Sequence, residues 1–432
     1  MTGGLVKETI VPDHSMMGAR AARSGVAGVL HRISRYAVLA NMKKLEYGRI
    51  TIIEKDRRYD FGREGLQATI NVSDTMFYAD LALGGSIGAA EAYISGFWSV
   101  DDLTVLVRII VQNRKVLADM ERGLAILTRP IQALRHRHRR NTLEGSMKNI
   151  SAHYDLGNEF YRLWLDRSMT YSCNIFKREC ATLEEAAAAK YECICRKLAL
   201  NPAHHVLEIG TGWGAFAIHA AKNYGCRITT TTISRQQYDY AEGRILEEGL
   251  SDRIELLFED YRNLNGTYDR LVSIEMIEAV GHHYLDTFFH ICSDRLKAEG
   301  LMALQAIIIE DQAYKAQLRQ PDFIKRYIFP GSFIPSISAI IESVAQATDM
   351  RLLDLEDITL NYARTLRTWR ERFFANIDAI RALGFQENFI RLWEFYFCYC
   401  EGGFQERYIG DVQMIFAKPG WRSFDTQKCV RS

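Results

Sequence analysis

The stretch Val206-Leu207-Glu208-Ile209-Gly210-Thr211-Gly212-Trp213-Gly214 decides the fold. Its first half completes a short apolar segment, His205–Ile209, which we predict to be a β-strand. The apolar spacing that follows predicts a helix over Ala215–Asn223. Glycines at a strand-to-helix turn allow the backbone to approach a nucleotide-like ligand closely. Taken alone, the motif is also compatible with a tight turn that binds nothing.

The residues around this turn indicate which ligand it holds. Gly210, Gly212 and Ala215 satisfy a relaxed dinucleotide fingerprint. However, the second predicted strand ends in Thr229–Thr232, without the acidic residue that would hold the ribose of NAD. An acidic residue, Glu208, stands instead just before the first glycine. This arrangement favours S-adenosylmethionine, a cofactor without a pyrophosphate.

Outward from the turn, short β-branched segments alternate with helical patterns, as in a parallel α/β sheet. The further strands are predicted at Arg227–Ile233, Arg253–Phe258, Arg270–Glu275 and Leu301–Ile308. The helices between them are predicted at Gln236–Glu248 and Tyr284–Leu296. Aromatic-rich helices follow at Ala363–Arg381 and Gln386–Cys400. Val412–Ala417 is predicted to be a last strand, antiparallel and at the sheet edge.

The chain divides into three predicted parts, namely a disordered stretch 1–27, a small mixed α/β domain 28–141 and a catalytic α/β domain 142–432. The small domain contains predicted strands at Arg49–Glu54 and Thr69–Val72 and predicted helices at Ser86–Phe97 and Asp101–Asn113. It ends in a long helical stretch, Lys115–Arg140, that Pro130 should kink or break.

Composition excludes several classes of protein. A net charge of +1 gives no general attraction to nucleic acid, so no nucleic-acid partner is expected. The nine cysteines form no C-x-x-C pair and no His/Cys ligand spacing, which favours reduced thiols and no metal site. The sequence has neither a signal-peptide pattern nor an apolar run long enough to span a membrane. We therefore expect a cytoplasmic protein.

Further motifs follow one another between Leu83 and Ala417. They are Gly85–Gly88, Glu91–Tyr93, Gly96–Trp98, Ala152–Asn158, Met169–Cys173, Thr232–Gln237, Asp260–Arg262, Glu275–Gly281, Arg326–Gly331, Tyr362 and Cys400–Phe404. In this order, together with the glycine turn, they resemble the cyclopropane-fatty-acyl-phospholipid synthases and their mycolic acid relatives. The resemblance implies a Rossmann-like class I methyltransferase sheet with helical insertions, plus the smaller mixed α/β N-terminal domain.

The resemblance also implies the reaction. The methyl group of S-adenosylmethionine is added to a cis double bond of a phospholipid acyl chain, which leaves a carbocation at the neighbouring carbon. A bound bicarbonate ion then removes a proton from the added methyl group, and a cyclopropane ring closes. The implied partners are phospholipid acyl chains at the membrane surface and a second copy of the chain in a homodimer. The N-terminal domain would position lipid or form the dimer.

Site residues are carried over from the family's motifs. The cofactor-binding residues are Tyr171, Ser172, Glu208, Gly210, Gly212, Gly214, Thr232, Gln237, Tyr261 and Arg262. The bicarbonate-binding residues are Cys173, Glu278, Gln305, Ile307 and Tyr362. The catalytic set is Glu278, Cys173, Tyr362 and Cys400.

Each catalytic candidate also has a structural interpretation. Glu278 could be a helix-start carboxylate, Cys173 a small buried apolar residue and Tyr362 a core aromatic. For Cys400 the structural interpretation is favoured, because alkene methylation requires no thiolate.

One position departs from the family. The cyclopropane synthases have a histidine among the bicarbonate ligands where this chain has Gln305. Glutamine donates a hydrogen bond but carries no charge near neutral pH. Three alternatives follow: a methyl-branched unsaturated product without ring closure, a catalytically inactive lipid-binding protein, and a methyltransferase for a soluble small molecule. The retained Glu278 and glycine turn argue against the inactive protein, and the N-terminal domain against the soluble substrate.

A basic run, Arg135–Arg140, with Arg129 nearby, offers a surface for anionic lipid headgroups. Charge runs of this kind are also common at solvated helix ends and interdomain linkers. We expect peripheral association with the membrane.

Overall fold

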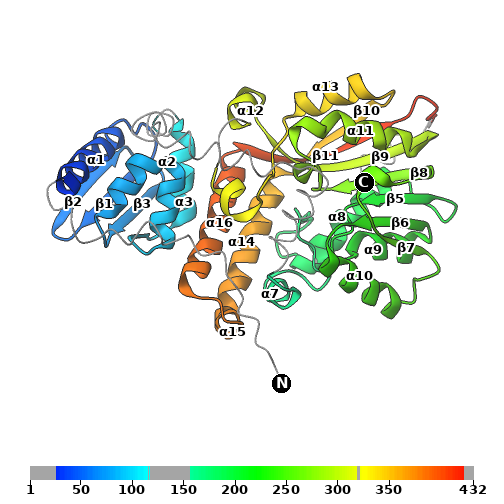
Figure 1. The fold of residues 1–432 in the computed structure, drawn as a ribbon, viewed down its shortest axis with the longest axis horizontal. Helices are drawn as coiled ribbons and strands as arrows, with labels where there is room; N and C mark the ends of the chain where they lie inside the picture. Colours follow the sequence, from blue (N-terminus) through cyan, green and yellow to red (C-terminus); the bar gives the residue numbers. More distant parts are fainter. Residues whose placement is uncertain (1–25, 115, 117–155, 319–321, 423–432) are drawn as a thin grey trace. The chain divides into compact units, whose positions relative to one another are not determined.

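The computed structural model describes residues 26–114, 116, 156–318 and 322–422 of the chain (Figure 1). Contacts divide these residues into two compact units. One comprises the described part of Met1–Pro130 together with Arg381–Tyr399. The other comprises the described part of Ile131–Ile380 together with Cys400–Ser432.

The N-terminal unit contains a four-stranded mixed sheet in the order β2-β1-β3-β4. Its strands are β1 (Arg49–Glu54), β2 (Arg57–Gly62), β3 (Gln67–Val72) and β4 (Trp98–Val100). β1 pairs antiparallel with β2 and parallel with β3, and β3 pairs antiparallel with β4. The sequence predicted β1 and most of β3 and gave no indication of β2 or β4.

Helices α1 (Val26–Met42), α2 (Met76–Ile94) and α3 (Leu103–Gln112) accompany this sheet. Asp102 begins α3 by accepting a hydrogen bond from the Val105 amide, as a helix N-cap does. Helix α2 starts ten residues before the predicted Ser86–Phe97. It is interrupted at Gly85, whose φ of 58° and ψ of −138° are non-helical, so the predicted helix corresponds to its second half.

The catalytic unit is built on a seven-stranded sheet in the order β10-β11-β9-β8-β5-β6-β7. The strands β5 (His205–Ile209), β6 (Arg227–Thr232), β7 (Ile254–Phe258), β8 (Tyr268–Ile274) and β9 (Leu296–Ile309) pair parallel with one another, and β9 pairs antiparallel with β11 on its other side. β10 (Arg351–Asp357) and β11 (Ile409–Ala417) pair antiparallel. The strand order reverses between β5 and β8, and ligands of open α/β sheets bind beyond the carboxyl ends of strands at such a point.

Helices cover both faces of this sheet (Figure 1). On one face α11 (Leu285–Asp294) and α13 (Ile337–Ala347) pack against residues such as Leu207, Leu271 and Leu304. On the other, α8 (Leu183–Lys197), α9 (Ala215–Tyr224) and α10 (Arg235–Glu247) pack against Val206, Ile228 and Val272. Neighbouring residues of one strand thus enter opposite cores, which is why the parallel strands are apolar on both sides.

The remaining described helices are α7 (Asn158–Arg162), α12 (Asp311–Gln317), α14 (Thr359–Ala375), α15 (Ile377–Ala382) and α16 (Glu387–Gln405). Short 3-10 turns follow β7 and β8, and a π-helical turn spans Ile324–Ile328.

The prediction for the last strand was wrong in one respect. β11 is antiparallel as expected, but it lies between β9 and β10 rather than at the edge. The unpredicted strand β10 forms that edge.

Several predictions fall on residues that the structure does not describe. These are the disordered stretch 1–27 except its last two residues, almost all of the long helix 115–140 with Pro130, the basic run, Arg129 and the start of the Ala152–Asn158 motif. Of the described residues, no helix has both the length and the apolar character needed to cross a bilayer.

Candidate active site

The glycine turn connects β5 to α9 as predicted. Gly210, Gly212 and Gly214 have φ angles of 104°, 54° and 86°, values that L-residues rarely adopt. A Cβ atom at Gly214 would lie 3.3 Å from the Cβ of Ala241, so this glycine lets α10 approach the turn. A Cβ atom at Gly212 would meet no heavy atom within 4 Å, so its backbone borders open space. The turn therefore has room for a ligand at Gly212.

Glu208 lies beneath this turn rather than on its surface. The residue is 2% exposed, and its Oε2 accepts a 2.6 Å hydrogen bond from the Thr230 hydroxyl of β6. Burial raises the pKa of Glu208 to about 8. The carboxyl group therefore ties β5 to β6 and holds a proton at neutral pH. A direct contact with the cofactor stays a prediction.

Thr232 and Gln237 meet at the carboxyl end of β6. The Thr232 hydroxyl donates to Gln237 Oε1 over 2.9 Å and accepts from the Ser234 amide. Ser234 in turn caps α10 by accepting from the Gln237 amide. The two predicted cofactor residues thus form one small polar corner beside the glycine turn.

Tyr261 and Arg262 follow β7 in a short 3-10 turn. The Tyr261 ring is buried and packs edge-on against Phe288, with ring centroids 5.6 Å apart. The Arg262 guanidinium forms a bidentate ion pair with Asp260, with both N–O distances at 2.7 Å. Arg262 is therefore held in a fixed orientation, and the contact of either residue with adenine stays a prediction.

The Tyr171–Cys173 segment follows Met169, whose φ of 61° is positive. The Tyr171 ring lies among aromatic rings, with centroids 5.3 Å from Trp369, 5.4 Å from Trp164 and 6.1 Å from Phe329. The Ser172 hydroxyl accepts a 2.6 Å hydrogen bond from Lys190 Nζ. Lys190 is fully buried on α8, and burial lowers its pKa to about 8 despite the nearby carboxylates.

A carboxylate that the sequence did not single out lies at the centre of the predicted bicarbonate site. Glu275 Oε1 accepts hydrogen bonds from the Cys173 amide at 2.8 Å and from Gln305 Nε2 at 2.7 Å. Its Oε2 accepts a 2.7 Å hydrogen bond from the Tyr362 hydroxyl. Glu275 directly follows β8 and has a φ of 48°, so a non-glycine residue adopts the left-handed region here. The structure thus brings Cys173, Gln305 and Tyr362 together around Glu275.

Two further carboxyl groups flank Glu275. Glu278 Oε1 accepts a 2.6 Å hydrogen bond from the amide of Ile307, another of the predicted bicarbonate-binding residues. Burial, followed by the charge of Glu275, raises the pKa of Glu278 to about 8. Asp411 on β11 is also buried, and burial and the charges of Glu275 and Glu278 raise its pKa well above the ordinary value. Glu278 therefore holds a proton at neutral pH, and the proton affinity of Asp411 is increased in the same direction.

Gln305 bridges the cluster as a neutral group. Besides Glu275, its Nε2 donates to the Cys173 carbonyl at 3.3 Å and lies 3.4 Å from Asp411 Oδ2. Its Oε1 accepts a 3.0 Å hydrogen bond from Gln413 on β11. Both ends of the amide are thus engaged, which fixes its orientation.

The two cysteines of the predicted catalytic set differ in their surroundings. The Cys173 thiol is buried, and burial and the neighbouring charges of Asp411 and Glu275 raise its pKa, so it stays a neutral thiol. Cys400 is partly exposed on α16, four residues before Phe404, whose ring stacks on Tyr362 at 4.4 Å. A catalytic role for Cys400 stays a prediction.

Sequence reasoning missed Glu275, Asp411 and Lys190. Glu275 could have been identified from the sequence, because an acidic residue directly after a parallel strand lies where such sheets bind ligands. Asp411 stands just before the segment predicted as the last strand, and its placement depends on the pairing of β11 with β9. Lys190 lies in an alanine-rich helix, and its sequence context gives no sign that its ammonium group is buried.

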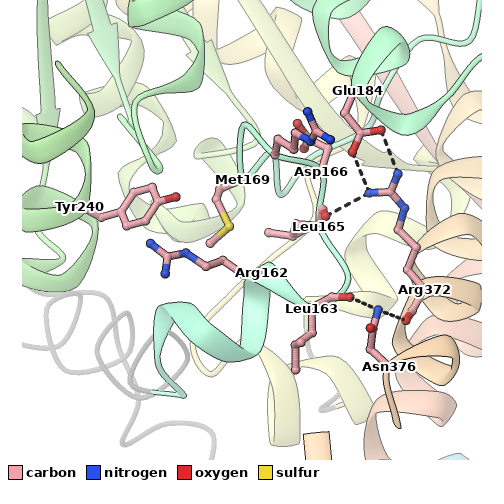
Figure 2. Close-up of a pocket in the computed structure, with 10 residues that line it drawn as sticks. Arg162, Leu163, Leu165, Asp166, Met169, Glu184, Tyr240, Arg372 and Asn376 are labelled. Atoms are coloured by element: carbon pink, nitrogen blue, oxygen red, sulfur yellow. Dashed lines mark hydrogen bonds and ion pairs between the residues drawn. The ribbon is translucent and has the colours of Figure 1, made fainter. Parts of the chain in front are cut away.

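A separate pocket of about 470 Å³ lies in the same unit (Figure 2). Arg162, Met169 and Tyr240 are among its lining residues, and Arg372 on its wall pairs with Glu184. None of the predicted site residues lines this pocket, so it is not the candidate active site.

Comparison with known proteins assigns this site to a family. Residues 141–414, well over half of the chain, match the model of the mycolic acid cyclopropane synthetases. The chain belongs to this family. It is an S-adenosylmethionine-dependent methyltransferase with a class I methyltransferase fold.

Curated relatives cover most of the chain. The tuberculostearic acid methyltransferase UfaA1 of Mycobacterium tuberculosis is 36% identical over 78% of this chain and 80% of its own length. The cyclopropane-fatty-acyl-phospholipid synthase of Escherichia coli strain K12 is 34% identical over 81% of this chain and 88% of its own. Of the solved structures, the mycolic acid cyclopropane synthase CmaA1, complexed with SAH and CTAB, has 31% identity and a TM-score of 0.58. The match covers 63% of this chain and 98% of that one.

Proposed function

We propose that this methyltransferase adds a one-carbon unit from S-adenosylmethionine to the cis double bond of an unsaturated acyl chain in membrane phospholipid, and that a cyclopropane ring results. The observation that carries this proposal is the carboxyl cluster around Glu275, which lies at the carboxyl ends of β8 and β9. Alkene methylation needs a base beside the added methyl group, whereas methylation of an amine or hydroxyl group does not need such a cluster. The names of the relatives agree with an acyl substrate.

The residues around the glycine turn fit S-adenosylmethionine. The open space at Gly212 admits a ligand against the backbone, and the polar corner of Thr232 and Gln237 stands beside it. We expect these groups and Ser172 to hold the cofactor. When bound, it supplies an electrophilic methyl group.

The aromatic rings near the cofactor site suit a transient cation. Tyr171, Trp164 and Trp369 present π faces and edges within one cluster. Aromatic faces attract cations, by about 0.5–2 kcal/mol for each favourable contact. Trp164 and Trp369 are fully buried, so the side of the site that they form is apolar.

Gln305 supports a second candidate product. The family resemblance places a histidine at this position in the cyclopropane synthases, and here it is a neutral amide with both ends hydrogen-bonded. If proton removal from the added methyl group is slow, the cation loses a proton from another carbon. The result is a methyl-branched unsaturated chain. One relative is named a methyltransferase and another a cyclopropane synthase, so the names agree with either product.

Mass spectrometry of phospholipid fatty acids distinguishes the products. Cells with and without this protein are supplied with methionine labelled in its methyl group. We expect one labelled one-carbon unit per modified chain and loss of the double bond. Retention of the double bond would establish the methyl-branched product, and Gln305→His should then shift the products towards the ring. Absence of label from all acyl chains would contradict the proposed function and leave an inactive lipid-binding protein.

A further inference from the structure

The bicarbonate ion implied by the family requires hydrogen-bond donors. In this chain the donors that would bind it are hydrogen-bonded to a side chain of the protein. A small anion would be bound by the Cys173 amide, Gln305 Nε2 and the Tyr362 hydroxyl. In the structure all three donate to the carboxylate of Glu275, at 2.8, 2.7 and 2.7 Å. A carboxylate has the same planar O–C–O group as bicarbonate, and the two cannot occupy these donors together.

On the basis of the function proposed above, we propose that Glu275 is the catalytic base of this methyltransferase and takes the place of bicarbonate. The residues present therefore do not fit bicarbonate as a cofactor.

Charge argues against an additional anion. Glu275, Glu278 and Asp411 bring three carboxyl groups into one cluster, and the buried ammonium group of Lys190 interacts electrostatically with Glu275 and Asp411. A further negative charge in such a site would be repelled by any ionised neighbour and would lose its hydration. Burial raises the pKa of Glu278 to about 8, so this carboxyl group holds a proton at neutral pH, and burial raises the pKa of Asp411 as well. Glu275 is the carboxyl group to which the Cys173 amide, Gln305 Nε2 and the Tyr362 hydroxyl all donate, and this geometry makes it the base of the cluster.

The backbone of Glu275 gives independent support. A non-glycine residue with a φ of 48° is strained and persists where the surroundings hold it. The Glu275 amide donates to the Gln305 carbonyl at 2.8 Å, which fixes the backbone against β9. This conformation turns the side chain towards Cys173 and Tyr362 instead of continuing the strand. Strain of this kind is typical of functional sites.

The proton transfer balances without another reactant. After methyl addition, a C–H bond of the added methyl group breaks and its proton forms an O–H bond with Glu275. The electron pair of that bond forms the new C–C bond to the cationic carbon and closes the ring. Oε2 accepts a hydrogen bond from Tyr362, and Oε1 accepts hydrogen bonds from Cys173 and Gln305. An ionised carboxylate has about four lone-pair positions over its two oxygens, so Glu275 can accept the proton in this cluster.

The first test measures whether turnover depends on bicarbonate. The full-length enzyme is assayed with S-adenosylmethionine and vesicles of unsaturated phospholipid in carbonate-free buffer under nitrogen, with and without added bicarbonate. We expect equal rates. A rate that falls on removal of bicarbonate and recovers on its addition would overturn the proposal while leaving the proposed function intact. Absence of any modified acyl chain from the wild-type reaction would refute both.

Two variants test the carboxylate itself. Glu275→Gln keeps the size of the side chain but removes the base, and we expect turnover to fall by about 100-fold or more, the usual effect of a general base. Glu275→Gly removes the side chain and frees the three donors. We expect this variant to be nearly inactive in carbonate-free buffer and to regain turnover when bicarbonate or formate is added. Full activity of Glu275→Gln would overturn the proposal.

Controls separate catalysis from folding. Affinity for S-adenosylmethionine and the melting temperature are measured for each variant, because a merely structural role would change these as well as turnover. Glu342→Gln on α13 serves as the matched substitution, since Glu342 is exposed and accepts a 3.2 Å hydrogen bond from Gln346 outside the site. We expect it to retain wild-type turnover. Rescue of Glu275→Gly by the small anions requires a folded site, so it supports the proposal even if stability falls.

Discussion

Tyr362 makes two contacts whose effects can be separated. Its hydroxyl donates to Glu275 Oε2 at 2.7 Å, and its ring stacks on Phe404. Tyr362→Phe keeps the ring and removes the donor. We expect turnover to fall by about 10-fold or more, because a hydrogen bond to a charged group contributes about 1.5–3 kcal/mol. Affinity for S-adenosylmethionine should not change, since this hydroxyl lies in the carboxyl cluster.

Steady-state assays and calorimetric titration of the cofactor measure the two effects. Tyr238→Phe is the matched control, because its hydroxyl also donates to a glutamate, Glu242, at 3.3 Å but outside the site. We expect no change in turnover for this variant. A Tyr362→Phe enzyme with wild-type turnover would show that the hydroxyl does not orient the base.

At the level of single residues, the sequence predicted which groups would gather but not which of them is central. Cys173, Gln305 and Tyr362 were expected in one site, and the structure places them around one carboxylate. Glu275 and Glu278 are three residues apart in the same motif. Which of the two receives these donors depends on the left-handed φ of Glu275, a property that the order of residues does not show.

Among the elements, the glycine turn offers a test of cofactor binding. At Gly212 there is room for a methyl group, but its φ of 54° would strain an alanine by about 1–2 kcal/mol. The added Cβ would also enter the space that we assign to the cofactor. We expect Gly212→Ala to weaken binding of S-adenosylmethionine by at least about 10-fold, since strain of this size acts on the turn that holds it.

Isothermal titration calorimetry of the purified variant checks this expectation. Gly243→Ala is the control, because Gly243 lies on α10 with no atom within 4 Å of an added Cβ and without a positive φ. This substitution should leave affinity unchanged and stabilise the helix by up to about 1 kcal/mol. Equal cofactor affinity of Gly212→Ala and the wild type would place the cofactor away from this turn.

The elements that the sequence predicted well are those buried on both faces. β5, β6, β8 and β9 are almost wholly apolar or β-branched and lie between two cores, so their pattern is unambiguous. β2 and β10 were missed because they are mostly exposed and rich in charged residues, as Arg351–Asp357 shows. Edge strands of this kind lack the apolar pattern on which prediction from sequence relies.

On the scale of the whole molecule, the division of the chain depends on contacts between distant segments. Arg381–Tyr399 clusters with the N-terminal unit, although it lies inside the stretch 142–432 that the sequence suggested as one domain. Arg391 donates to the carbonyls of Tyr93 and Trp98, and the Tyr93 hydroxyl donates to Glu394 at 2.6 Å. Contacts between residues some three hundred positions apart cannot be recognised from the local composition of the sequence.

Global stability should depend on pH through Glu208. Its pKa is about 8 in the folded protein, against an ordinary value of 4.5, because the carboxyl group is buried between β5 and β6. Below the ordinary value the group is protonated in both states and contributes no pH dependence. Between pH 4.5 and about 8 only the folded state holds this proton, so stability falls as pH rises. The slope for one such group is about 1.4 kcal/mol per pH unit.

Glu208→Gln removes this titration while keeping an acceptor for the Thr230 hydroxyl. Unfolding by urea at pH 5, 6.5 and 8 should show the variant gaining stability relative to the wild type as pH rises, because the wild type loses its bound proton on unfolding. Glu342→Gln, the same substitution at an exposed position of α13, is measured in parallel as the control. A difference between Glu208→Gln and the wild type that stays constant from pH 5 to 8 would mean that Glu208 is ionised in the folded protein. The carboxylate would then be available to a ligand in the glycine turn, as the family resemblance first suggested.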